Sequence, residues 1–269
     1  MEKKRHLTKK ERNKEIIQSY NKMNPDFFEN ADIEVSKKEN FIETKIRFSL
    51  ESLSEVELET ITSIAIKCNM QELLSELLAT DFVAKKRVAI SAFPTAIKEG
   101  NIEIVKMLVK AGADVKVYNN FAIREASEKG DTELVKFLIE NGADVTANDN
   151  YAILVASKNG FIEIVKLLIE AGADVAANDN GAILMALKAG NTELVKLLMK
   201  SGADITEHKN SALMHATAKG NKEMVKMLIE AGADVTINDN YNIKIARKKG
   251  YKEIEKMLIN AGADKNAIK

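Results

Sequence analysis

A period of thirty residues governs most of this chain and restricts its fold more than any other feature. The triplet Gly-Ala-Asp occurs six times at constant spacing, beginning at Gly112, Gly142, Gly172, Gly202, Gly232 and Gly262. A second glycine series keeps the same period, at Gly100, Gly130, Gly160, Gly190, Gly220 and Gly250. Periods of this length are typical of proteins in which each unit buries its apolar face only against its neighbours. The chain is therefore predicted to be an array of stacked units.

Each unit has the pattern of two helices joined by turns. From Tyr151, apolar residues recur at helical spacing and stop at Gly160, a natural residue to follow a helix end. Asn150 precedes this helix, and its side chain is expected to cap the N–H groups of the first turn. The second helix, IEIVKLLIE, is expected to begin in four other units after a capping residue: Asn101, Asp131, Asn191 or Asn221.

The run A-S-K-N-G-F-I-E-I-V-K-L-L-I-E-A-G-A-D-V resembles the second half of an ankyrin repeat. Six units, over residues 91–269, share this resemblance, and a degenerate copy over residues 58–90 precedes them with Asn69 in place of the turn glycine. The resemblance implies an all-α, ankyrin-type solenoid of helix-turn-helix units. Ankyrin repeats usually have 33 residues and a Thr-Pro-Leu-His box, which here reads Tyr-Ala-Ile-Leu from Tyr151. We infer that the missing residues shorten the projecting loops.

Residues 1–57 do not fit the repeat, and a small mixed α/β cap is predicted there. A basic helix is expected over about residues 7–20, and FIETKIRFSL alternates as a strand with one buried face does. DIEV is a candidate hairpin partner, and a helix is expected over EVELETITSIAIK after Ser54. We expect this block to dock on the first repeats, the alternative being a separately mobile domain. At the other end, Glu255 and Lys265 replace valines and predict a solvated C-terminal cap.

The charge balance and the cysteine content restrict the expected partners and the expected cellular compartment. Forty basic residues balance forty acidic ones, so no overall field steers the chain to nucleic acid or an anionic membrane. The single cysteine, Cys68, cannot form an internal disulfide, and the N-terminus has no apolar segment behind its charges. We expect a cytoplasmic monomer, located in a host cytoplasm if the protein is an exported effector.

Catalytic and metal-binding patterns are not found. His208 and His215 are seven residues apart, but no ligand set forms around them. Cys68 lies near the end of a helix expected in the degenerate copy, where a packing or surface thiol is favoured over a nucleophile. The glycines do not form a phosphate-binding loop, because helix termination accounts for them. We therefore predict no enzyme, no metal, no cofactor and no small-molecule substrate.

The ankyrin resemblance implies a binding groove formed by the loop tips and the exposed side of each first helix. Aromatic residues and Arg amid lysines are typical of a protein-binding surface, and the lysines favour a partner with an acidic surface. Alternatively, Leu154, Leu184 and Met214 pack under the shortened loops, and the lysines stabilise helix ends. The candidate residues are Tyr118, Phe121, Arg124, Tyr151, Leu154, Lys158, Leu184, Lys188, Met214, Lys219, Tyr241 and Lys248.

These features favour a non-catalytic scaffold that binds a protein through its concave groove, as an inhibitor, immunity protein or effector. The Lys-, Asn- and Ile-rich composition suggests an AT-rich bacterial or viral genome. One alternative is that the N-terminal block carries the activity, by binding nucleic acid or an acidic partner, while the repeats target it. Another is a self-assembling array, against which the charged C-terminal cap argues.

Overall fold

The computed structural model describes residues 32–38, 41–47, 55–78 and 82–267. The chain divides into an N-terminal unit, residues 1–117, and a C-terminal unit, residues 118–269, which are described separately. The basic helix expected near residues 7–20 lies outside the described residues. Among the described residues, no helix is both long and apolar enough to cross a bilayer.

In the described part of the N-terminal unit, β1 (Asp32–Lys38) and β2 (Phe41–Arg47) form an antiparallel hairpin, as predicted, with Val35 opposite Thr44. Helices α2 (Glu55–Lys67), α3 (Gln71–Leu78), α4 (Phe82–Glu99) and α5 (Ile102–Lys110) follow. Asn69 has a φ of 55°, so it takes the left-handed conformation expected at the turn glycine. Helix α4 runs without a break across residue 91, where the sequence pattern placed a repeat boundary. That division, and the docking of the hairpin on the repeats, stay predictions.

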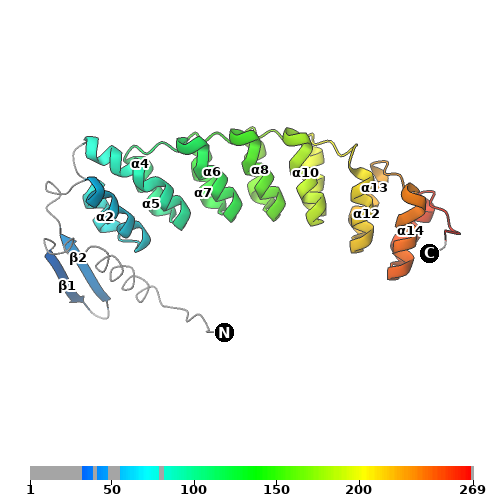
Figure 1. The fold of residues 1–269 in the computed structure, drawn as a ribbon, viewed down its shortest axis with the longest axis horizontal. Helices are drawn as coiled ribbons and strands as arrows, with labels where there is room; N and C mark the ends of the chain where they lie inside the picture. Colours follow the sequence, from blue (N-terminus) through cyan, green and yellow to red (C-terminus); the bar gives the residue numbers. More distant parts are fainter. Residues whose placement is uncertain (1–31, 39–40, 48–54, 79–81, 268–269) are drawn as a thin grey trace. The chain divides into compact units, whose positions relative to one another are not determined.

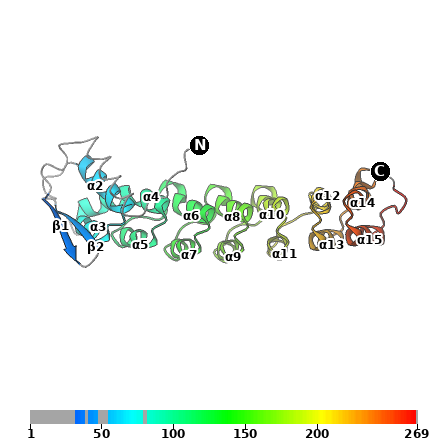
Figure 2. The same ribbon diagram turned by 90° about the horizontal axis from the view of Figure 1, so that it is seen from below.

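Five helix pairs form the C-terminal unit. Within it, the first helices lie in one row and the second helices in a parallel row (Figures 1 and 2). The first helices are α6 (Val117–Lys129), α8 (Ala147–Asn159), α10 (Ala177–Ala189), α12 (Lys209–Lys219) and α14 (Ile237–Lys249). The second helices are α7 (Thr132–Glu140), α9 (Ile162–Glu170), α11 (Thr192–Lys200), α13 (Lys222–Glu230) and α15 (Lys252–Asn260). The predicted all-α solenoid is confirmed.

The core of this unit repeats with the same period as the sequence. Ile164, Val165 and Leu168 of α9 are fully buried, and so are their counterparts in α7 and α11. In the last repeat Glu255 takes the place of the valine, but it is not simply solvated as predicted. Its Oε1 accepts a hydrogen bond of 2.7 Å from Arg247 Nε, and each side chain is only 28% exposed. The last repeat therefore carries an ion pair where the other repeats carry a buried valine, because a partly buried charge needs a partner.

The predicted caps of the second helices are confirmed. Each accepts a hydrogen bond from the backbone N–H three residues later, and the four are Asn101, Asp131, Asn191 and Asn221. Where an aromatic residue stands at this position, its ring covers a glycine of the preceding repeat. A Cβ on Gly130 would lie 2.6 Å from Phe161 Cζ, and a Cβ on Gly220 would lie 2.8 Å from Tyr251 Cζ. Both glycines also have positive φ, so two independent constraints select glycine there.

The loop between repeats contains a short left-handed turn. Asn148, Asp149 and Asn150 have φ values of 56°, 54° and 58° and ψ values of 50°, 49° and 34°. Asn and Asp enter this region more readily than other residues with side chains, because they form local hydrogen bonds. The repeated Asn-Asp-Asn therefore has a conformational reason. The same turn recurs at residues 118–120, 178–180 and 238–240.

The side chain of Asn150 joins two repeats instead of capping a helix. Its Oδ1 accepts a hydrogen bond of 2.8 Å from the backbone N–H of Asp174 in the next repeat. The predicted N-cap role of Asn150 is therefore wrong, because stacking brings this N–H within reach of the amide oxygen. The same bond recurs from Asp144 to Asn120, Asp204 to Asn180, Asp234 to Asn210 and Asp264 to Asn240.

Candidate protein-binding face

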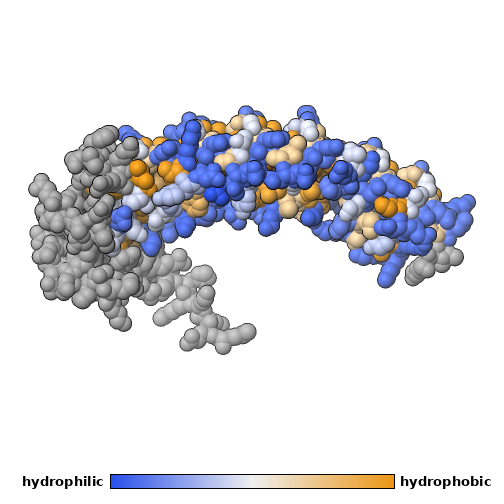
Figure 3. All heavy atoms as spheres, turned by 45° about the horizontal axis from the view of Figure 1, so that its top comes forward, coloured by the Kyte–Doolittle hydropathy of each residue, from blue (hydrophilic) through white to orange (hydrophobic). Residues whose placement is uncertain are grey.

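The first helices of the C-terminal unit present one recurring surface, here called the first-helix face. All twelve candidate residues from the sequence lie on α6, α8, α10, α12 and α14, and none of them is buried. Positions 124, 154, 184, 214 and 244 carry half-exposed side chains, while Lys158, Lys188, Lys219 and Lys248 are exposed. Because the helices repeat every thirty residues, these positions form rows along the unit. Figure 3 shows apolar residues interspersed among hydrophilic ones over the repeats.

An apolar stretch occupies the middle of the first-helix face. Leu154, Leu184 and Met214 are half-exposed. Leu154 Cδ1 lies 3.0 Å from where a Cβ on Gly181 would stand, so this leucine also packs over the next repeat. Met214 Sδ accepts a hydrogen bond of 3.4 Å from Asn238 Nδ2. These side chains thus combine packing between repeats with exposed apolar surface.

The lysines at the helix ends differ in their contacts. Lys219 Nζ donates to the backbone oxygen of Lys188 at 2.7 Å, and Lys249 Nζ donates to Ala218 O at 2.6 Å. Both cations therefore cap the end of the preceding first helix, where the helix dipole is negative. Among the described residues, Lys158, Lys188 and Lys248 have no ion-pair partner and keep their charges available.

Carboxylates lie at the opposite edge of the same face, a feature that sequence reasoning missed. Asp149, Asp179 and Asp239 are exposed in the left-handed turns that begin α8, α10 and α14. Lys244 Nζ lies 2.6 Å from Asp239 Oδ2, so its charge is already paired. The first-helix face is thus acidic at the loop edge and basic at the helix ends, rather than uniformly basic. The aspartates recur in the sequence with the same period as the lysines. That both lie on the first-helix face depends on the left-handed turn.

Tyr118, Arg124 and Tyr151 form a cluster at the start of the unit. Arg124 Nε donates to Asn119 O at 3.3 Å, and Nη2 donates to Tyr118 O at 3.4 Å. The guanidinium carbon lies 5.9 Å from the centroid of the Tyr151 ring, within the range of a cation–π interaction. Tyr118 is 63% exposed, more than any other large hydrophobic residue in the described part of the chain. The structure thus brings together three candidates from two repeats.

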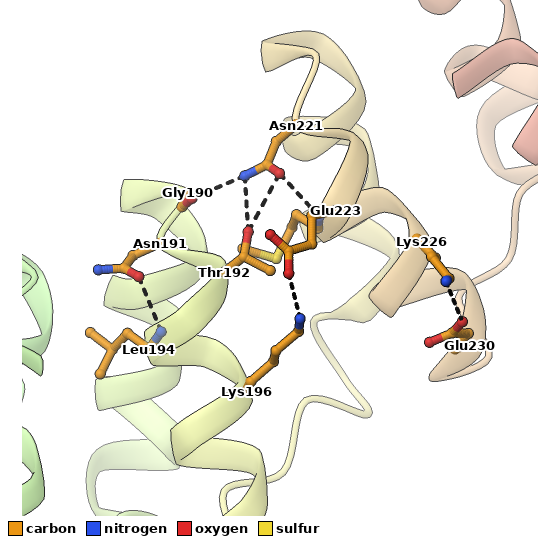
Figure 4. Close-up of polar contacts among 10 residues, drawn as sticks. Gly190, Asn191, Thr192, Leu194, Lys196, Asn221, Glu223, Lys226 and Glu230 are labelled. Carbon is orange, nitrogen blue, oxygen red and sulfur yellow. Dashed lines mark hydrogen bonds and ion pairs between the residues drawn. The ribbon is translucent and has the colours of Figure 1, made fainter. Parts of the chain in front are cut away.

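The second-helix face differs, because ion pairs join the second helices of neighbouring repeats. Lys196 lies 2.5 Å from Glu223 across two repeats, and Lys222 forms an ion pair with Glu253. Figure 4 shows the Lys196–Glu223 pair beside Asn221, whose amide nitrogen donates to Gly190 O at 3.0 Å while its amide oxygen caps α13. Exposed ion pairs of this kind contribute little stability each.

The described residues that could bind a metal ion or act as a nucleophile are considered next. No three His, Cys, Asp or Glu side chains in this part of the chain lie close enough together to hold a metal ion. Cys68 is buried, and that burial raises the pKa of its thiol, which makes it a poor nucleophile at neutral pH. His215 Nδ1 lies 2.9 Å from Ser211 O on α12, a contact within one helix.

Comparison with known proteins agrees with the fold. A family model described as ankyrin repeats (3 copies) matches residues 62–149, 95–179, 153–239 and 209–269. Among solved structures, an ankyrin repeat domain from Acinetobacter baumannii is similar at 26% identity and a TM-score of 0.51, covering 63% of this chain and 96% of that one. No curated protein matches the chain. With the helix pairs, the left-handed glycines and a family match that extends from residue 62 to residue 269, the chain belongs to the ankyrin-repeat family.

Proposed function

We propose that this protein is a non-catalytic scaffold that binds a protein partner through the first-helix face. Ankyrin repeats are in general protein-interaction modules. The observation that carries the proposal is the contrast between the two faces. Ion pairs between repeats, Lys196–Glu223 and Lys222–Glu253, lie on the second-helix face. The first-helix face instead presents the exposed Tyr118, the half-exposed Leu154–Leu184–Met214 stretch and unpaired lysines.

The chemistry of this face favours a partner with an acidic surface and apolar anchors. Lys158, Lys188 and Lys248 supply unpaired positive charge at one edge, and the apolar stretch supplies area to be buried. The repeats hold these side chains on rigid helices, which limits the entropy lost on binding. Blocking a partner's own surface in this way is how the protein would act as an inhibitor, immunity protein or effector, as a monomer in the cytoplasm.

The test is affinity capture with the full chain, followed by mass spectrometry and a direct measurement of each captured protein's affinity. The double variant Lys158→Glu and Lys188→Glu reverses charge on the first-helix face, and Lys136→Glu makes the same change on the second-helix face. We expect a partner retained by the wild type and by Lys136→Glu but lost by the double variant. A partner that binds all three equally, at affinities insensitive to salt, would show that the first-helix face is not the site.

A further inference from the structure

The cluster around Arg124 differs from the equivalent position in every other repeat of the C-terminal unit. That row reads Arg124, Leu154, Leu184, Met214 and Lys244. The two cations stand at opposite ends of it and differ in state. Lys244 is neutralised by Asp239 at 2.6 Å, whereas no carboxylate among the described residues pairs with Arg124. The free positive charge of this row is therefore located at its first repeat.

Arg124 is held in place by contacts that leave its binding edge unused. Its bonds to Asn119 O and Tyr118 O occupy Nε–H and one N–H of Nη2. Arginine has five N–H donors in a planar fork, so three remain, on Nη1 and Nη2. The Tyr151 ring at 5.9 Å lies against the guanidinium carbon. The side chain is thus pre-organised, and its remaining donors match the two oxygens of a carboxylate.

Tyr118 supplies the second half of the cluster. It has a φ of 53° and a ψ of 45°, a region that a bulky aromatic residue rarely adopts. The other left-handed turns carry Asn at this position, at residues 148, 178 and 238. Arg124 donates to the backbone oxygen of Tyr118, so the guanidinium is held against the residue that carries the exposed ring. Tyr and Arg at such positions are the residue types that dominate binding energy at protein interfaces.

We propose that Tyr118 and Arg124 form the primary anchor of the first-helix face, and that they bind a peptide segment carrying an Asp or Glu beside an apolar side chain. The carboxylate bonds the free edge of Arg124, and the apolar side chain packs on the Tyr118 ring. This inference rests on the proposed function. It adds the chemistry of the partner and the orientation of the partner along the first-helix face. The partner's acidic residue lies at the α6 end of the face, not at the α14 end.

The test is selection of random twelve-residue peptides displayed on phage, carried out on the full chain and on two variants. Arg124→Gln removes the charge, and Lys244→Met changes the same row where the charge is already paired. We expect acidic residues to be enriched on the wild type and on Lys244→Met, but not on Arg124→Gln. Synthetic copies of the selected peptides should lose roughly 10- to 100-fold in affinity on Arg124→Gln, the scale of hydrogen bonds between charged groups. Thermal unfolding checks that both variants stay folded.

The other outcomes separate this inference from the proposed function. Equal enrichment of acidic residues on all three proteins, or peptides without acidic residues, would overturn the role of Arg124 and leave the first-helix face as the site. Peptides whose affinity is also insensitive to Leu184→Asp bind elsewhere, which overturns the proposed function together with this inference. If Arg124→Gln does not fold, Arg124→Lys, which keeps the charge, is tested in its place. Acidic enrichment on a folded Arg124→Lys supports binding through the charge, and its loss overturns the role of Arg124 in binding.

Discussion

Replacing Asn242 with alanine is expected to stabilise the protein. Asn242 lies in α14 with no exposed surface, and neither atom of its amide has a hydrogen-bond partner among the described residues. The equivalent positions in the other repeats of the C-terminal unit are alanines, all buried. A buried amide without partners costs about 1–3 kcal/mol relative to a satisfied one. Alanine also favours a helix over asparagine by about 0.5 kcal/mol.

The net change in unfolding free energy is the sum of these two gains minus the cost of the cavity that the substitution leaves. Removing the amide leaves a small cavity, which offsets about 1 kcal/mol. The expected increase in unfolding free energy is therefore about 0.5–2.5 kcal/mol, which corresponds to a rise in Tm of roughly 1–10 °C for a domain of this size. Urea denaturation followed by circular dichroism measures the free energy. Amide hydrogen exchange in α14 and α15 locates the gain in the last repeat, since repeat arrays open locally.

The mirror-image substitution is the matched control. Ala152→Asn places the same amide in α8, where Ala152 is 1% exposed, and it should destabilise the protein by at least the same amount. If Asn242→Ala instead lowers the unfolding free energy by 1 kcal/mol or more, the amide of Asn242 is satisfied in solution. The reasoning from its buried, unpaired atoms would then be refuted.

Three further predictions test contacts between and within repeats. Asn150→Gly keeps a residue suited to positive φ but removes the inter-repeat hydrogen bond, so unfolding by urea should show a loss of about 1 kcal/mol. Gly130→Ala should cost about 1–3 kcal/mol more than an alanine at a left-handed glycine with free space, since its Cβ meets the Phe161 ring; calorimetry measures the difference. The hydroxyl and backbone N–H of Thr206 lower the pKa of Asp204, so Thr206→Val should raise that pKa in an NMR titration.

Two of these predictions have a further check. Gly172→Ala has positive φ and nothing within 4 Å of its Cβ, so it isolates the backbone strain from the collision at Gly130. The pKa of Asp204 is lowered in the folded state, so its stabilising contribution is present above the ordinary carboxyl pKa and is lost as pH falls through the lowered one. Thr206→Val should therefore reduce acid destabilisation in that window. An unchanged pKa would show that the hydroxyl does not hold the carboxylate.

The helices and their ends could be predicted because local chemistry sets them. Asn191 caps α11 and Gly190 turns left-handed after α10, both as the sequence indicates. Contacts between repeats were harder to predict. Lys219 is assigned to the binding face by its position, yet it also bonds a backbone oxygen 31 residues earlier. Arg124 is a candidate by its place in the repeat and its residue type, and its hydrogen bonds to the left-handed turn become visible only once that turn is known.

The sequence by itself determined the repeat unit, the helix pairs and the residues that face the core. These depend on apolar periodicity, capping side chains and glycine φ values, all of which act within a few residues. The tertiary structure alone decided that Asn150 bonds Asp174, that Glu255 pairs with Arg247, and which cations of the first-helix face remain free. Such contacts depend on the offset between stacked repeats and on a left-handed turn. Neither leaves a local pattern, because the partners meet only when one unit packs on the next.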